Sequence, residues 1–414
     1  MTDRYLVESR VYCRQNTARG YAAIRLRLQM PVVDTSTSTK PPDHCPNRKH
    51  PCSGTTFHRY GTPKKPVCDI FVHLVRAQRW KCTSCGYIFR VYPQGVTRRR
   101  QSLRLQAMSV YYWILGLSLG AVTDALAPLG CHLGRTTVFD NLRQTGTVAR
   151  RRLRERLRSK MHVRVVAMDF THVAEQGHDK AVMHASDATT GLVIEITPLH
   201  AEDEHTVTRY VQRIAKLTGC EVIVTDDADT FKTAADAAGV QHALCQQHVV
   251  PNTLTLLSEI TEQMEHLQPH QPIPRGLSVA QALDDIALLE ETILARSPGS
   301  QRHLDELCRR YQAVPVLKRG VKANPWYRLR LLTLDLAEDW PRLTMSERYR
   351  SGDGQRLVPT TNNVSERGIG LNIKERYRTM RGYKSTTSLR CTPTLTAYLR
   401  EHQGSECFSD LLAA

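Results

Sequence analysis

The chain has 414 residues and carries 57 Lys and Arg against 40 Asp and Glu, a formal net charge of +17. This length exceeds what one typical hydrophobic core supports, so we expect two to four domains. No apolar run is long enough to span a bilayer, and the N-terminal stretch MTDRYLVESRVYCRQ lacks a signal-peptide core. The sequence therefore argues against membrane and secreted proteins and predicts an intracellular one.

The positive charge is clustered along the chain. TRRRQSLR (97–104) and ARRRLRERLRSK (149–160) are two such clusters. Lys and Arg residues that neutralise phosphates release counterions, so clustered charge favours a nucleic-acid partner. The alternative, a basic soluble protein without a polyanionic partner, is the weaker explanation, because it does not account for the clustering of the positive charge.

A cysteine-rich unit is predicted at 44–95, after an N-terminal segment (1–43) to which the sequence assigns no role. Disulfides are not expected in a reducing compartment. Cys82 and Cys85 form a C-x2-C pair, and Cys45 and Cys52 are the best second pair for a tetrahedral zinc ion. The spacing of the second pair is wide, so four residues stay open as substitutes for one ligand: His44, His50, His58 and Cys68.

Zinc is favoured over unmetallated thiols on a small β unit, and over a redox pair, since no thioredoxin-like unit surrounds the C-x2-C. The aromatic and basic residues around WKCTSCG are typical of a small zinc ribbon that faces DNA. The unit is therefore predicted to be a zinc ribbon with one structural zinc ion.

Residues 96–160 predict a helical region that ends in a basic linker helix. LSLGAVTDALAPLG fits the first helix of a helix-turn-helix, and GRTTVFDNLRQ fits the second. Side chains of the second helix are candidates for contacts with phosphates and base edges: Arg135, Thr136, Thr137, Asn141 and Arg143. A plain helical hairpin explains the same pattern, but the position between a zinc ribbon and a basic helix favours a DNA reader.

An α/β core is predicted to begin at residue 161. Its elements alternate between strands and helices: a strand (162–173), a hairpin (180–199), a helix (202–219), a strand (221–227), a helix (230–239) and a strand with a turn (240–249). The first part of the core covers 161–250, and a helical insertion follows at 251–355. The last part of the core, with a tail, covers 356–414.

Three carboxylates in this region are the candidate catalytic groups. Asp169 and Asp226 lie at the ends of buried strands, and Glu366 lies at the start of a later helix. Acids in such an order can converge on two divalent cations for phosphodiester chemistry, and carboxylates suit magnesium or manganese.

Taken singly, each acid has a plainer explanation. Asp169 fits a strand-end turn, Asp226 fits a helix cap beside Asp227 and Asp229, and Glu366 fits a capping box with Asn363. Four basic residues after the helix start are predicted to hold DNA phosphates: Arg367, Lys374, Arg376 and Arg381.

Taken together, the motifs resemble a known family. Asp169, TDDA (225–228), CQQH (245–248) and TNNVSER (361–367) are similar to motifs of prokaryotic DDE transposases, closest to the insertion-sequence and mutator-like groups with a C-x2-H signature. The resemblance covers about 44–390 and implies a ribonuclease H-like catalytic core with a helical insertion. It also implies that Asp169, Asp226 and Glu366 are the catalytic acids.

The resemblance implies further that Cys245 and His248 are the C-x2-H pair, for which we expect a structural role in packing and hydrogen bonding. One departure is Asp227, which stands where relatives often have glycine.

The expected function is therefore that of a DNA transposase of an insertion sequence, in the cytoplasm of a prokaryote and associated with its nucleoid. Its expected cofactors are two magnesium or manganese ions and one zinc. Its expected partners are terminal inverted repeats, target DNA and further copies of the chain in a homodimer or larger oligomer. A catalytically inactive, transposase-derived DNA-binding regulator and a metal-dependent DNA nuclease are the alternatives.

Overall fold

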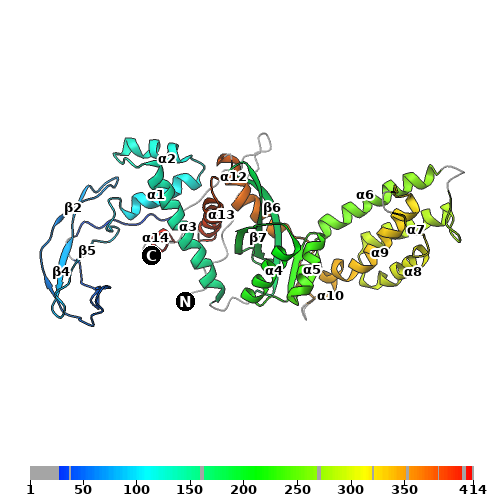
Figure 1. Cartoon of the computed structure of the whole chain (residues 1–414), viewed down its shortest axis with the longest axis horizontal. Coiled ribbons are helices and arrows are strands. Elements are labelled where there is room, and N and C mark those ends of the chain that lie inside the picture. The colour runs from blue at the N-terminus through cyan, green and yellow to red at the C-terminus, as the bar shows by residue number, and fades with distance from the viewer. Residues whose placement is uncertain are drawn as a thin grey trace. The chain divides into compact units, whose positions relative to one another are not determined.

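The computed structural model describes residues 28–36, 39–158, 163–267, 272–318, 321–350, 354–380, 382–402 and 407–412 (Figure 1). The chain forms two compact units. The first comprises Met1–Glu155, Val173–Lys180 and Gly370–Ala414, and the second comprises Arg156–His172 and Ala181–Ile369. No helix among the described residues is both long and apolar enough to cross a membrane.

A five-stranded sheet forms the centre of the second unit. Its strands lie in the order β10-β9-β6-β7-β8. β9 runs parallel to β6 and to β10, whereas β7 and β8 are antiparallel. The strands are β6 (Val165–Glu175), β7 (His178–Asp187), β8 (Val193–Pro198), β9 (Val222–Thr225) and β10 (Gln241–Leu244). The predicted α/β class is confirmed.

Both faces of this sheet are buried, which explains its nearly continuous apolar strands. Alternate residues of β6 point to opposite faces, so Val166 and Met168 pack on one side and Val165 and Ala167 on the other. The first side is covered by α4 (Glu204–Thr218) and α5 (Asp229–Ala238). Asp203 caps α4 at its start by accepting a hydrogen bond from the amide of Thr206.

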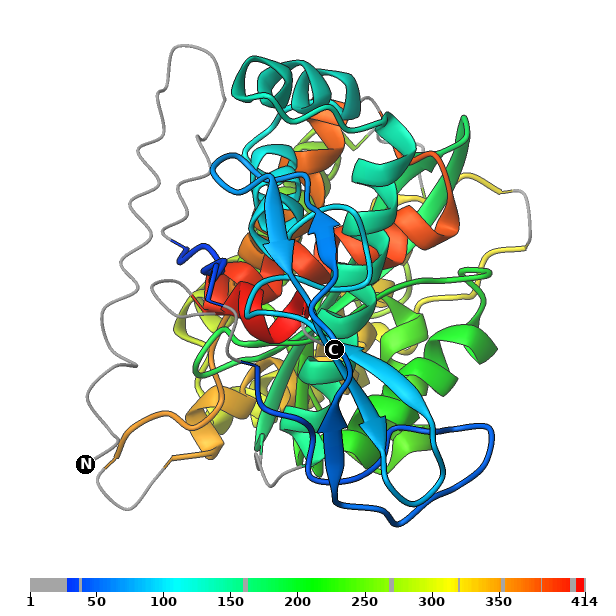
Figure 2. The same cartoon turned by 90° about the vertical axis from the view of Figure 1, so that its left-hand side faces the viewer.

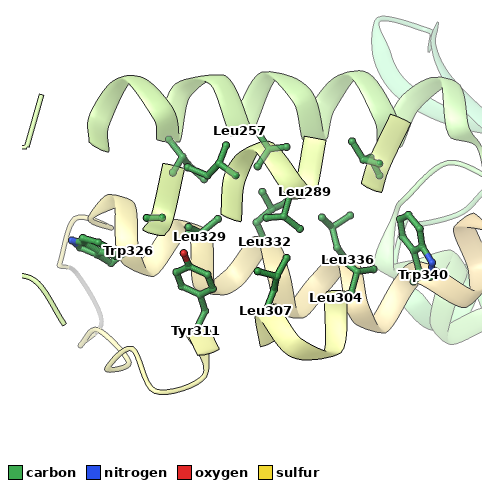
Figure 3. Packing of buried hydrophobic residues seen from close by; sticks show 14 of the residues in the cluster. Leu257, Leu289, Leu304, Leu307, Tyr311, Trp326, Leu329, Leu332, Leu336 and Trp340 are labelled. Atoms are coloured by element: carbon green, nitrogen blue, oxygen red, sulfur yellow. The ribbon is translucent and has the colours of Figure 1, made fainter. Parts of the chain in front are cut away.

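The predicted insertion is a helical layer with its own core, between β10 and the helix that carries Glu366. Figure 3 shows this core, with Trp326 and Trp340 at its two ends and leucines between them. Inside it, the buried Asp285 carboxylate accepts a hydrogen bond from the Tyr311 hydroxyl at 2.8 Å and pairs with Arg310. The helices are α6 (Gln246–Glu265), α7 (Val279–Ala295), α8 (Gln301–Tyr311), α9 (Pro325–Leu343) and α10 (Met345–Arg348).

The first unit begins with two small sheets, drawn in blue in Figure 2. One has the order β1-β4-β5, and the other pairs β2 with β3. The strands are β1 (Phe57–Arg59), β2 (Lys64–Pro66), β3 (Leu74–Arg76), β4 (Gln78–Cys82) and β5 (Ile88–Val91). Four buried valines form the apolar cluster of this region: Val33, Val67, Val75 and Val96.

The rest of the first unit is helical. Its main core joins apolar residues of α1, α2 and α3 with residues of α13 and α14 far along the chain. The helices are α1 (Leu103–Ile114), α2 (Leu119–Leu126), α3 (Arg135–Arg158), α12 (Glu375–Met380), α13 (Thr386–Glu401) and α14 (Cys407–Leu412). α3 is one continuous helix, so the predicted second helix of the helix-turn-helix and the basic linker helix are a single element.

Candidate functional site

Asp169 lies within β6, so its predicted place at a strand end is wrong, whereas Asp226 directly follows β9, the parallel neighbour of β6. β6 and β9 pair in the register Val165↔Val222, Val166↔Ile223 and Ala167↔Val224. Continued by two residues, this register sets Asp169 opposite Asp226, and neighbouring strands lie about 4.8 Å apart. Electrostatic repulsion from Asp226 contributes to the raised pKa of Asp169, as expected for carboxylates this close.

The acids that follow Asp226 are held by a lysine on α5. Lys232 Nζ lies 2.8 Å from Asp227 Oδ1 and 2.5 Å from Asp339 Oδ2 on α9. Asp229 is 3.5 Å from the same nitrogen and nearly fully exposed. The structure thus distinguishes Asp226, which faces Asp169, from Asp227, which is ion-paired.

Glu366 lies on α11 (Asn363–Ile369), which Asn362 ties to the sheet. Asn362 Nδ2 donates to the Met168 carbonyl at 2.8 Å, immediately before Asp169. Because α11 begins at Asn363, Glu366 is its fourth residue, and a capping box needs the acid at the third. The capping-box explanation of Glu366 is therefore wrong.

A buried histidine supports the same helix from β7. His184 Nδ1 lies 3.0 Å from Ser365 Oγ, and a Cβ added at Gly368 would lie 2.3 Å from the His184 ring. Burial lowers the pKa of His184 to about 4, so the ring is neutral at pH 7. Sequence reasoning missed this contact, since only the glycine and the serine in SERG hint at a close approach.

Asp169 and Asp226 are partly buried, and Asp226 and Glu366 each have an oxygen atom without a hydrogen-bond partner. Burial, followed by repulsion from Asp226 and Glu366, raises the pKa of Asp169 to about 6. Burial also raises the pKa of Asp226. Asp226 Oδ1 and Glu366 Oε1 are buried without a hydrogen-bond partner. Such oxygen atoms fit divalent cations, which take carboxylate ligands.

One ligand atom each from Cys245, His248 and Glu366 lie within 4.8 Å of one another, so Glu366 belongs to a cluster that could hold a metal ion. Among the described residues, Asp169 and Asp226 are not part of such a cluster.

Replacing Asp169 by Asn is expected to stabilise the metal-free protein by about 2 kcal/mol at pH 7.5. The folded-state pKa is raised from 3.8 to about 6, so this carboxyl costs stability as pH rises through that interval. The gain should be full above pH 6 and vanish near pH 4. Thermal unfolding of both proteins at pH 4.5 and 7.5 measures it, and equal melting temperatures at pH 7.5 would contradict it.

The C-x2-H pair adjoins the three acids. Cys245 is fully buried, and its Sγ accepts a hydrogen bond from the amide of Asn362 at 3.2 Å. His248 lies in the first turn of α6, where its Nε2 is 3.7 Å from Glu366 Oε1. The predicted strand before the pair is confirmed as β10, but the predicted turn is wrong, because α6 starts directly after Cys245. Cys245 thus contacts the residue that ties α11 to the sheet, and His248 lies next to Glu366.

The four predicted cysteines of the ribbon come together. Cys45 Sγ lies 3.6 Å from Cys85 Sγ, and Cys52 Sγ lies 3.9 Å from Cys82 Sγ. All four sulfur atoms lie within 4.8 Å of one another. A tetrahedral zinc ion with Zn–S bonds of about 2.3 Å needs sulfur atoms about 3.8 Å apart, so the set fits zinc. The open substitutes lie outside this group: His44, His50, His58 and Cys68.

Backbone geometry prepares this cluster. The Gly54 amide donates to Cys52 Sγ at 3.4 Å, and a Cβ added at Gly54 would lie 2.8 Å from Cys82 Sγ. Hydrogen bonds from the amides of Cys85 and Ser84 lower the pKa of Cys82 to about 7, whereas burial raises the pKa of Cys45 to about 12.

The predicted DNA contacts of α3 separate into exposed and buried residues. Arg135, Thr136 and Arg143 are exposed, and Thr137 is half-buried. Asn141 is fully buried, where its Nδ2 donates to Gln101 Oε1 at 3.1 Å. The prediction that Asn141 contacts DNA is therefore wrong, because its amide is used inside the helical core.

The predicted contacts after Glu366 separate in the same way. Arg367 and Lys374 are exposed. Arg376 is 1% exposed, and its guanidinium lies 4.2 Å from the centre of the Trp113 ring. The prediction that Arg376 contacts DNA phosphates is therefore wrong, because its side chain is buried in the protein. Arg381 lies outside the described residues.

Comparison with known proteins gives little similarity. No protein-family model and no curated protein matches the chain. Among solved structures, it is similar to the HTLV-2 integrase catalytic core domain with magnesium, dimeric form, at 16% identity and a TM-score of 0.18. That match covers 32% of this chain and 86% of the other. The trimeric form gives 15% identity and a TM-score of 0.18, with 40% and 94% covered. Similarity this low carries no argument about function.

Proposed function

We propose that the chain is a DNA transposase of an insertion sequence and that its second unit is a ribonuclease H-like catalytic domain. The observation that carries the proposal is the parallel pairing of β6 with β9, which brings Asp169 near Asp226, whose charge contributes to the raised pKa of Asp169. Glu366 lies on α11, which follows the helical insertion in the chain, and its charge also contributes to the raised pKa of Asp169. The motif order that resembles DDE transposases supports the same assignment.

The proposed catalytic residues act as ligands that would position divalent cations. Asp169, Asp226 and Glu366 would hold two magnesium or manganese ions, which supply a lowered pKa for water and neutralise charge on the phosphate oxygens. Water then breaks a phosphodiester bond and leaves a 3′-hydroxyl, which attacks a phosphodiester of target DNA and releases another 3′-hydroxyl. Asn362 and Ser365 keep α11, and so Glu366, against the sheet.

The exposed cations provide the DNA-binding surface. Arg135, Thr136 and Arg143 on α3 would contact DNA at the terminal inverted repeats, and Arg367 and Lys374 would hold phosphates. In the zinc ribbon, aromatic rings hold two arginines: Arg79 lies 5.1 Å from the Tyr60 ring and Arg59 lies 5.9 Å from the Trp80 ring. Two DNA ends must be joined in one event, so we expect a homodimer or a larger oligomer on DNA.

The test is magnesium-dependent cleavage and joining of DNA that carries the repeats flanking the gene. The native protein is expected to cut and join, whereas Glu366→Gln binds the same DNA without cutting. Cutting without joining would identify a nuclease. Binding by both proteins without cutting, in magnesium or manganese, would identify a regulator and overturn the enzymatic proposal.

A further inference from the structure

A cavity of about 550 Å³ lies inside the first unit, between α2, α3, α12 and α13. Four of its lining residues are basic: Arg135, Arg143, Arg376 and Lys384. None of its lining residues, all within the described part of the chain, is acidic. Apolar side chains, among them Phe139 and Leu395, complete the walls. The cavity shares no residue with the three acids or the four cysteines.

Three helices begin at this cavity. Ser118 caps α2, Arg135 is the first residue of α3, and Thr387 lies in the first turn of α13, and all three line the cavity. A helix N-terminus carries a partial positive charge and unpaired amides. The backbone thus adds to the positive charge of the side chains, a combination that binds anions.

Arg376 is a second, independent observation that suits an anion at this cavity. Its guanidinium stacks on Trp113 and donates to the Leu117 carbonyl at 2.7 Å and to Thr379 Oγ1 at 2.5 Å. Its Nε is buried without a hydrogen-bond partner. No described acidic residue forms an ion pair with it. A buried charge without a counter-charge is costly, so a ligand anion would relieve this one.

We propose that the cavity binds a single nucleotide, with its phosphate against Arg135, Lys384 and Arg376 and its base against the apolar wall at Phe139. The volume lies within the usual range for small-molecule sites. Inorganic phosphate would satisfy the cations but leave the apolar wall in water. A nucleotide supplies both an anion and a flat ring. This site goes beyond the proposed function, because it needs neither the catalytic acids nor magnesium.

The test is calorimetric titration of the native full-length protein with deoxyadenosine monophosphate in magnesium-free buffer. Deoxyadenosine and inorganic phosphate are each expected to bind more weakly than the nucleotide. Replacing both Arg135 and Lys384 by Gln should weaken nucleotide binding about tenfold or more, because charge-assisted contacts are lost. The matched control is Arg151→Gln, an exposed arginine of α3 outside the cavity, which should bind as the native protein does.

Competition by DNA identifies the source of the nucleotide. Because Arg135 also stands among the proposed contacts with duplex DNA, some displacement by a fully paired duplex is expected. Displacement at a concentration at least tenfold lower by a duplex with one unpaired adenosine assigns the site to unpaired DNA, whereas equal displacement by both duplexes assigns the competition to Arg135 alone and the site to a free nucleotide. Failure of both duplexes to compete assigns it to a free nucleotide. Absence of nucleotide binding, equal binding of phosphate alone, or an unaffected double variant would overturn the proposal. Glu366→Gln should bind the nucleotide normally, so a failure of cleavage leaves this result standing.

Discussion

Asp226→Asn is expected to slow magnesium-dependent DNA cleavage by about a thousandfold or more, since loss of metal-held charge removes several kcal/mol of transition-state stabilisation. Asp227→Asn, the same change one residue along the chain, should keep most of the activity. The reason is that the charge of Asp226, directly after β9, acts on Asp169, whereas Asp227 is ion-paired to Lys232. Single-turnover cleavage rates at saturating DNA measure the difference.

Two controls make this comparison decisive. DNA binding by both variants should equal that of the native protein, because neither aspartate lies among the proposed DNA contacts. Asp227→Asn also removes one charged partner of Lys232. Asp339 still pairs with that lysine at 2.5 Å, so the variant should fold. Equal loss of cleavage in the two variants would show that the assignment of Asp226 is wrong.

Removal of zinc is expected to unfold the ribbon, because a structural zinc ion contributes about 10 kcal/mol or more to folding. The three-stranded sheet has strands of only three to five residues, and the nearby apolar cluster consists mainly of four valines. So small a core does not fold without support. Cys82→Ala should lose the ion and, with it, binding of the flanking repeats.

Zinc content per chain, measured by mass spectrometry, tests this prediction together with DNA binding. Cys68→Ala is the matched control, since this cysteine lies outside the group of four and its variant should keep one zinc. A native protein without zinc, or a Cys82→Ala variant that retains it, would rule the site out.

The residue types at the candidate sites were predictable because each carries a local signal. Asp169 follows the apolar run VVAM inside β6, Asp226 directly follows β9, and Cys82 and Cys85 form a compact pair. The register that pairs the two aspartates was not predictable, because it depends on which strands become neighbours. The ion pair of Asp227 depends likewise on α9, a distant helix of the insertion.

Asn141 and Arg376 show why the DNA contacts were only partly predictable. Each lies in a segment whose polar residues suit a surface, yet each is buried by residues far away in the chain. Asn141 meets Gln101, and Arg376 meets Trp113. Local patterns report which residues can bind DNA, whereas burial depends on contacts that form only in the folded chain.

The late position of the segment 363–412 has a consequence for protein synthesis. α11 supplies Glu366 to the second unit, while α13 and α14 complete the core that α1, α2 and α3 share. At about 5–20 residues per second, a ribosome adds this segment many seconds after α1, α2 and α3 have been made. A premature stop or frameshift before Asn363 therefore leaves both units unfinished, and such a product should neither cut DNA nor compete with the full-length protein for its sites.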